Sequence, residues 1–507
     1  MIDKKSRRDK RGLAIRAGAI FLVLALLLGM VISAIPAFAG PARPDPKDKF
    51  EMEIQMLEDE QALHVVQRLT YHNRTGTDLE SVMFNLYANI YRRQESAPFE
   101  GANLESCYPD GFAPGGLDMQ RVEVNGQTAE WAVQGDYEIF MRVECPLEDG
   151  ASAEFTFEYY VLLPACTGRF GVGDMDWRIT NFYPVPAVYL LGDFQLEPYS
   201  AIGEPFFSEI ADYSVTLDAP DTYLVASSGL ATPGESENGR RTWTIEGQDL
   251  RELDMVISRK YTETTRQSGS GVQLYAYGNG TSASNRALEA ADRAFGFFTE
   301  KLGESGLTRF TVAESGYYRD QMAKPGLAVI SEELFERGQA EDLEYQVVNA
   351  VALQWTRFLV GSDASLEPWL SESMANYLTL LYYEETYGHD RFLEELNEQV
   401  LDSLRVTVPG NLTVDSAAER FNSQSEYDMI ILGRGAAVFH ELKGAMGGEA
   451  FWAALKRYFQ DNAGGIVSIA DFAAALNEGA EHTWDDFLMN QLYNIGDYVN
   501  QRIEWYE

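Results

Sequence analysis

The chain has 507 residues, of which 45% are hydrophobic and 12% aromatic, so it is long and apolar enough to bury more than one core. Its formal net charge of −38 excludes nucleic acid as an expected partner, because an anionic surface repels a phosphate backbone. Three cysteines, Cys107, Cys145 and Cys166, allow at most one disulfide within the chain. Disulfides therefore do not hold a body of this size together.

The first 39 residues have the order of an export signal. Basic residues between Lys4 and Arg16 precede an uncharged apolar run over residues 17–35, which is long enough to cross a bilayer. Residues 37–39 read A-F-A before Gly40, a typical cleavage signature. We expect residues 1–39 to be a signal peptide or a single membrane anchor, with the rest of the chain secreted or held outside the cell membrane.

Residues 40–49 contain a proline-rich linker, and residues 50–268 then show strand periodicity. Apolar and polar residues alternate over 50–56 and again over 213–217. Asn125-Gly126 between two such runs is typical of a tight hairpin turn. This pattern predicts a β-sandwich-like domain with one solvated face.

Helical periodicity becomes dominant in the second predicted domain, residues 269–507. Strands are expected over 272–277 and 310–313, with a helix between them over 282–302. A further helix is expected over 341–359, and the chain is predicted to be mostly helical after residue 340. In the last part, Gly444, Gly447-Gly448 and Gly464-Gly465 are expected to end helices.

Two segments of the second domain share the frame of a zinc-peptidase site. Residues 349–355 read N-A-V-A-L-Q-W and residues 369–377 read W-L-S-E-S-M-A-N-Y. A zinc helix needs H-E-x-x-H, because two histidines one turn apart face the metal while the glutamate acts as general base for the bound water. Here those three positions hold Asn349, Ala350 and Leu353.

The frame resembles the gluzincin aminopeptidase family, the alanyl-aminopeptidase-like zinc metallopeptidases, whose motifs are H-E-x-x-H-Q-W and W-L-x-E-x-x-x-x-Y. The resemblance implies a short bacterial-type member, with a thermolysin-like α/β-to-helical peptidase domain after the β-domain. It also implies that Glu372 is the remnant of the third zinc ligand. Gln354, Trp355, Trp369 and Tyr377 fit the motifs.

Two further landmarks of the family have also lost their functional side chains. The substrate-amine loop, G-x-M-E-x-x-G-L, aligns with residues 320–327, where Met322 and Gly326 fit but the glutamate position holds Ala323. The oxyanion motif, Y-x-K-G-A, aligns with residues 432–436, where the tyrosine position holds Leu432. The resemblance therefore implies a degenerate active site without catalytic residues or a zinc cofactor, although active relatives bind zinc.

These observations predict an exported pseudopeptidase that serves as a scaffold for a peptide or a cell-envelope protein. Its cleft is expected to be lined by residues that still fit the family motifs: Met322, Gly326, Gln354, Trp355, Glu372 and Tyr377.

Two alternatives remain open at the level of the sequence. The first is an active zinc metallopeptidase or another hydrolase with a non-standard site, although no G-x-S-x-G motif is present and the five histidines form no familiar ligand pair. The second is a structural component of a membrane complex.

Overall fold

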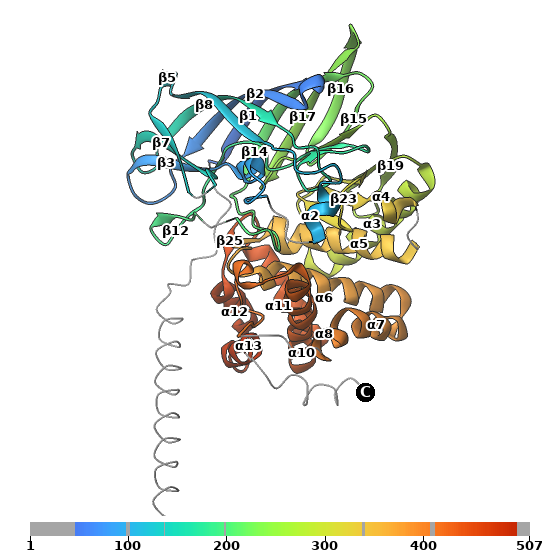
Figure 1. Ribbon diagram of the computed structural model, residues 1–507. Helices are drawn as coiled ribbons and strands as arrows, with labels where there is room; N and C mark the ends of the chain where they lie inside the picture. The colour runs from blue at the N-terminus through green and yellow to red at the C-terminus, as the bar shows by residue number, and fades with distance from the viewer. Residues whose placement is uncertain are drawn as a thin grey trace, which may run out of the picture.

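The computed structural model describes residues 46–97, 102–135, 137–196, 199–336, 340–405 and 411–493. A β-rich part comes first, followed by a small sheet with covering helices and then by a helical part, which lies below the large sheet in Figure 1. The predicted export segment, residues 1–39, lies outside these ranges. Within them, no helix is long and apolar enough to cross a membrane.

The β-rich part is built on an eight-stranded sheet with the order β16-β17-β14-β1-β2-β8-β4-β5. β1 runs parallel to β14, while the other paired strands are antiparallel. The strands are β1 (Asp48–Leu57), β2 (Ala62–His72), β4 (Gly116–Val124), β5 (Gln127–Thr128), β8 (Ser152–Leu162), β14 (Ala211–Pro220), β16 (Leu230–Glu237) and β17 (Arg240–Leu250).

Two four-stranded sheets share one hydrophobic core with the large sheet, so the expected sandwich-like layering is confirmed. Their orders are β15-β18-β10-β9 and β11-β3-β7-β6. The strands are β3 (Leu79–Asn85), β6 (Trp131–Gln134), β7 (Phe140–Leu147), β9 (Gly171–Val172), β10 (Trp177–Ile179), β11 (Val185–Pro186), β15 (Leu224–Ser227) and β18 (Met255–Ser258). β12 (Tyr189–Leu190) and β13 (Asp193–Phe194) form a separate hairpin.

Local sequence patterns explain several of these elements. β1 alternates strictly between buried and exposed residues, as its period of two predicts, and it begins at Asp48, inside the expected linker. The turn between β4 and β5 consists of Asn125 and Gly126, both with positive φ, which a tight hairpin requires. All three cysteines are buried free thiols.

The second domain starts with a five-stranded sheet of order β19-β20-β21-β23-β22, in which β20, β21 and β23 are parallel. Its strands are β19 (Thr262–Gln267), β20 (Gln273–Gly278), β21 (Arg309–Ser315), β22 (Gln321–Lys324) and β23 (Leu327–Ser331). β19 thus belongs to this sheet although it precedes residue 269, the predicted start of the second domain. β19 pairs with β20, but as a mostly exposed edge strand it resembles in sequence the polar strands that precede it.

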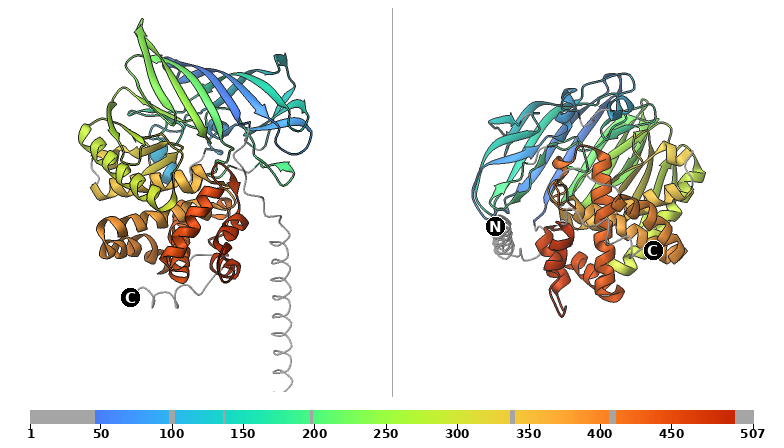
Figure 2. Two further views of the ribbon diagram at one scale, coloured as in Figure 1. Left: turned by 180° about the vertical axis from the view of Figure 1, so that it is seen from behind. Right: turned by 60° about the horizontal axis from the view of Figure 1, so that its bottom comes forward.

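Helices cover this sheet and, with the short strand pair β24 (Gly361–Ser362) and β25 (Ile466–Val467), make up most of the rest of the described chain, in agreement with the expected α/β-to-helical order (Figure 2). They are α3 (Thr281–Leu302), α4 (Glu332–Glu336), α5 (Ala340–Leu353), α6 (Pro368–Tyr387), α7 (His389–Leu396), α8 (Asp402–Arg405), α9 (Gln424–Tyr427), α10 (Gly435–Met446), α11 (Gly448–Asp461), α12 (Ile469–Asn477) and α13 (Asp485–Leu492). The short helix α2 (Ala102–Cys107) comes earlier, in the β-rich part of the chain. Gly447 caps α10, whereas Gly444 lies inside it and does not end the helix.

Candidate functional site

The candidate site, defined by the positions of the zinc-helix frame, lies on α5 and α6, which pack against each other beside β22 and β23. α5 passes directly into a π-helical segment, Gln354–Leu359, so the predicted helix over 341–359 is continuous in path but changes its hydrogen-bond spacing. This arrangement brings the three frame positions of α5 and Glu372 of α6 into the same part of the domain.

The three frame positions of α5 carry no group that ligates zinc strongly or accepts a proton from water. The Asn349 carboxamide accepts a hydrogen bond from Gln321 Nε2 at 2.8 Å and donates one to Thr379 Oγ1 at 3.4 Å. Ala350 and Leu353 are buried in the hydrophobic core of the domain. The interior face of α5 is therefore filled by amide contacts and hydrocarbon.

Glu372, the remnant ligand, is held by an arginine. Its Oε1 accepts a hydrogen bond from Arg357 Nη1 at 2.9 Å, and the Glu372 side chain is only 14% exposed. Burial raises the pKa of Glu372, while the positive charge of Arg357 opposes that shift. Arg357 comes from the π-helical segment, one turn after Leu353, so the chain supplies its own cation to this carboxylate.

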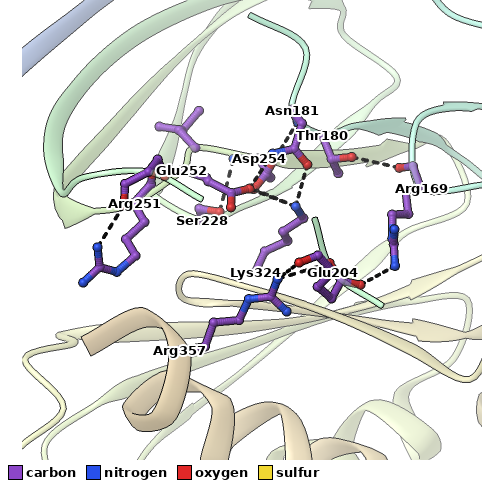
Figure 3. A network of polar contacts seen from close by, with 12 residues as sticks. Arg169, Thr180, Asn181, Glu204, Ser228, Arg251, Glu252, Asp254, Lys324 and Arg357 are labelled. Atoms are coloured by element: carbon purple, nitrogen blue, oxygen red, sulfur yellow. Dashed lines mark hydrogen bonds and ion pairs between the residues drawn. The ribbon is translucent and has the colours of Figure 1, made fainter. Parts of the chain in front are cut away.

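The same arginine connects the two domains through Glu204 (Figure 3). Arg357 Nη2 donates to the Glu204 carbonyl at 3.3 Å and lies 3.6 Å from Glu204 Oε2. Glu204 also pairs with the buried Arg169. Burial acts to raise the pKa of Glu204, but Arg169 and then Arg357 hold it below its usual value. Charges from both domains thus form one continuous network.

A second buried network crosses the domain junction at Lys324 (Figure 3). Lys324 Nζ donates to Asn181 Oδ1 at 2.6 Å and to Glu252 Oε2 at 2.9 Å, and it lies 3.9 Å from Asp254 Oδ2. Burial raises the pKa of Asp254 to about 7, with Lys324 opposing the shift. Lys324 follows Ala323, so the segment that aligns with the substrate-amine loop carries a cation that is hydrogen-bonded to the β-domain.

Gln354 has a structural task in this arrangement. Its Oε1 accepts from the Gly326 N–H at 2.8 Å, while its Nε2 donates to the carbonyls of Ala350 at 2.9 Å and Lys324 at 3.2 Å. The side chain therefore ties the β22–β23 turn to α5. Gly326 is required there because its φ is +65° and an added Cβ would lie 2.9 Å from the Ser228 carbonyl.

Three of the expected cleft residues belong to the interior. Trp355 is fully buried, packs near Phe295 and Phe298, and donates its indole N–H to the Gly303 carbonyl at 3.0 Å. Tyr377 is also fully buried, with its hydroxyl 3.1 Å from His440 Nδ1. Met322 is 1% exposed in a small separate core. These residues stabilise the scaffold and do not line a surface opening.

The oxyanion position is also without its hydroxyl. Leu432 is partly buried, and its carbonyl accepts a hydrogen bond from Asn376 Nδ2 at 3.0 Å. The sequence frame gave no reason to select Tyr427, yet its side chain is buried, and burial together with the negative charge of Glu372 raises the pKa of its hydroxyl. The Tyr427 hydroxyl is enclosed without a hydrogen-bond partner.

Zinc, which the family resemblance implies, does not fit these donors. Among the described residues, no group of three or more His, Cys, Asp and Glu side chains is placed to hold a metal ion. Zinc sites in peptidases use three strong protein ligands and one open position. At the frame positions only Glu372 has a suitable group, and Arg357 occupies it.

The chain is similar to zinc metallopeptidases in part of its sequence and in its fold. Residues 321–492 match the model of the peptidase family M1 domain. The whole chain has the fold of the M1 zinc metallopeptidase from Deinococcus radiodurans, with 16% identity over 91% of this chain and 97% of that one and a TM-score of 0.63. No curated protein matches the sequence.

Two other solved structures agree with this comparison. A mutant of the Deinococcus radiodurans enzyme gives 16% identity over 90% of this chain and 97% of that chain, with a TM-score of 0.65. The mutant bound to a Tyr-Ser-Ala substrate gives 17% identity over 90% and 96% of the two chains, with a TM-score of 0.63. The predicted resemblance to the gluzincin aminopeptidases and the predicted fold class are confirmed.

Proposed function

We propose that this protein is an exported pseudopeptidase that uses the M1 fold to bind a peptide or a cell-envelope protein without cleaving it. One observation carries the proposal: the two histidine positions and the base position of the zinc helix hold Asn349, Leu353 and Ala350. Without two of three ligands the affinity for zinc falls, and without the glutamate no side chain activates a water molecule.

The contacts of the side chains at the frame positions support a protein without catalytic activity more than they support an enzyme with a different reaction. Asn349 is engaged by Gln321 and Thr379, and Glu372 is engaged by Arg357. The hydrogen bond from Arg357 occupies Glu372 Oε1, so a water molecule would have to compete with the guanidinium for that oxygen. Export is supported by the sequence of residues 1–39 alone.

The retained scaffold supports a binding role. Arg357, Glu204 and Arg169 keep the β-domain and the helical domain in contact beside the positions of the zinc-helix frame. A solved mutant relative with the same fold is bound to a Tyr-Ser-Ala substrate. Buried polar networks of this kind hold groups in fixed positions, which favours recognition of a partner.

The proposal is tested with an aminopeptidase assay and calorimetry on the same preparation. We expect no hydrolysis of amino-acid amides or short peptides, with or without added zinc, and binding heat for at least part of a peptide library. Zinc-dependent hydrolysis would show an active metallopeptidase, and hydrolysis insensitive to chelators would show another hydrolase. Absence of peptide binding together with co-purification of a membrane protein would favour the structural role instead.

A further inference from the structure

A pocket of about 60 Å³ lies in the β-domain, lined by residues of neither α5 nor α6. It is formed where β1 and β14 begin and β2 ends, with the segment 185–189 on one side. β1 and β14 are parallel, and Phe50 pairs with Tyr213 in their register. The two rings stack with centroids 4.8 Å apart and form an aromatic wall.

The positive charge that lines this pocket is already engaged. Asp48 Oδ1 accepts hydrogen bonds from Arg74 Nη1 at 2.8 Å and from the His72 N–H at 2.9 Å. Arg74 Nη1 also donates to the Pro46 carbonyl at 2.9 Å. Arg251, whose positive charge opposes the rise in the pKa of the pocket residue Glu209, donates its N–H groups to three backbone carbonyls.

Two polar groups that line the pocket are not engaged. Among the described residues, neither Glu209 nor Tyr71 has a hydrogen-bond or ion-pair partner, although Tyr71 is 94% buried, with a relative exposure of 6%. Burial raises the pKa of Glu209, while Arg251 and Arg74 oppose that shift. A partly buried carboxylate without hydrogen-bond donors is costly, and the one arginine that lines the pocket, Arg74, donates to Asp48 and Pro46 instead of Glu209.

We propose that this pocket binds a primary ammonium group, with Glu209 as its counter-ion and the Tyr71 hydroxyl as a second acceptor. An ammonium group is compact and carries three N–H donors, which matches these two acceptors. Phe50 and Tyr213, which stack on each other, give the pocket an apolar wall suited to the methylene groups next to the ammonium. A metal ion is a poorer fit, because the described residues place no group of three suitable ligands anywhere.

The ammonium group has two chemical sources, a lysine side chain and the amino terminus of a chain. Titrations of the full-length protein with Nα-acetyl-lysine amide and with alaninamide distinguish them. Propylammonium is the minimal probe and 1-propanol is its uncharged counterpart. We expect saturable binding of propylammonium and of one of the two amides, and no binding of propanol.

Glu209→Gln removes the charge and keeps the shape of the side chain. We expect this variant to bind propylammonium at least about 10-fold more weakly, with no fall in Tm, because Glu209 makes no hydrogen bond to the described residues and burial of its charge is itself costly. Tyr71→Phe should weaken binding by a smaller factor. Glu95→Gln, at an exposed carboxylate outside the pocket, is the matched control and should bind as the parent does.

Two results would overturn the proposal: no saturable binding of propylammonium to the parent protein, or an affinity that survives both Glu209→Gln and Tyr71→Phe. The pocket is separate from the α5–α6 site, so a finding of peptidase activity would leave this inference standing.

Discussion

Arg357 makes the contacts that connect the candidate site, although none of the family motifs includes this position. It neutralises the remnant ligand Glu372 and reaches Glu204 of the other domain. In a zinc enzyme this carboxylate faces a dication. Here the guanidinium of Arg357, from the π-helical segment that follows α5, supplies a positive charge without offering any Lewis acidity.

Arg357→Met should therefore destabilise the protein by about 3 kcal/mol, because it leaves the Glu372 carboxylate buried without its cation. The loss should be largest above neutral pH and smaller in acid, where the raised pKa of Glu372 allows the carboxyl to take up a proton. Urea unfolding at several pH values measures this effect.

The double variant Arg357→Met with Glu372→Gln serves as the matched control. Removing both charges should recover a large part of the lost stability, since no uncompensated charge remains. If the double variant is as unstable as the single one, packing of the Arg357 side chain is the dominant contribution and the ion pair is not.

Titration of Asp254, at the domain junction, is expected to make the stability of the folded protein fall as the pH rises. Its pKa is raised to about 7, whereas an aspartate in an unfolded chain titrates near about 4. Between these values the folded protein holds a proton that the unfolded chain has released, so the contribution of Asp254 to stability is lost as pH rises through this window. Asp254→Asn should flatten that part of the stability profile.

The profile is obtained from chemical denaturation between about pH 4 and pH 8. Asp110→Asn, at an exposed position, should leave it unchanged. An Asp254→Asn profile parallel to that of the parent would show that Asp254 does not titrate in this range.

At the scale of elements, two glycines in similar sequence surroundings have opposite roles. Gly326 closes the β22–β23 turn with positive φ and contacts Ser228, while Gly444 lies within α10 with open space around it. Gly326→Ala should destabilise the protein by about 1–3 kcal/mol. Gly444→Ala should stabilise it by about 0.5–1 kcal/mol, because alanine is the better helix former.

Thermal unfolding of the two variants measures both effects. A stabilising Gly326→Ala substitution would contradict the close approach of this turn to Ser228. A destabilising Gly444→Ala substitution would contradict the position of Gly444 inside α10.

Periodicity was sufficient to predict the elements whose faces differ clearly in polarity. β1 alternates, and α3 buries residues at helical spacing, so both were predicted within two residues. β19 lies before the predicted domain boundary, because an exposed edge strand shows no apolar face that would indicate which sheet it joins. Gly444 was expected to end a helix because glycine alone does not reveal the backbone angle that it adopts.

At the scale of the whole molecule, the positions that align with the family motifs could be predicted from the sequence. The ion pairs and hydrogen bonds that their neighbours make across the domain junction could not. Fixed motif spacing was enough to place Asn349, Ala350, Leu353 and Glu372. Arg357 and Glu204 are 153 residues apart, and Lys324 and Glu252 are 72 apart. Only the folded chain brings such partners together, and only burial shows that Trp355 and Tyr377 belong to the core.

The junction itself depends on backbone contacts that carry no sequence signal. Arg251, just after β17, donates to the carbonyls of Phe358 and Gly465 in the helical domain. Gly361 leaves room for the guanidinium, since an added Cβ would lie 2.5 Å from its Cζ atom. The two domains are thus joined beside the π-helical segment that positions Arg357.

The most direct test of the proposed function is the metal content of the purified full-length protein, measured by mass spectrometry after incubation with zinc and removal of unbound metal. The proposal predicts far less than one zinc ion per chain, because Asn349 and Leu353 replace two ligands and Arg357 holds the third. Close to one zinc ion per chain, retained through washing, would contradict it.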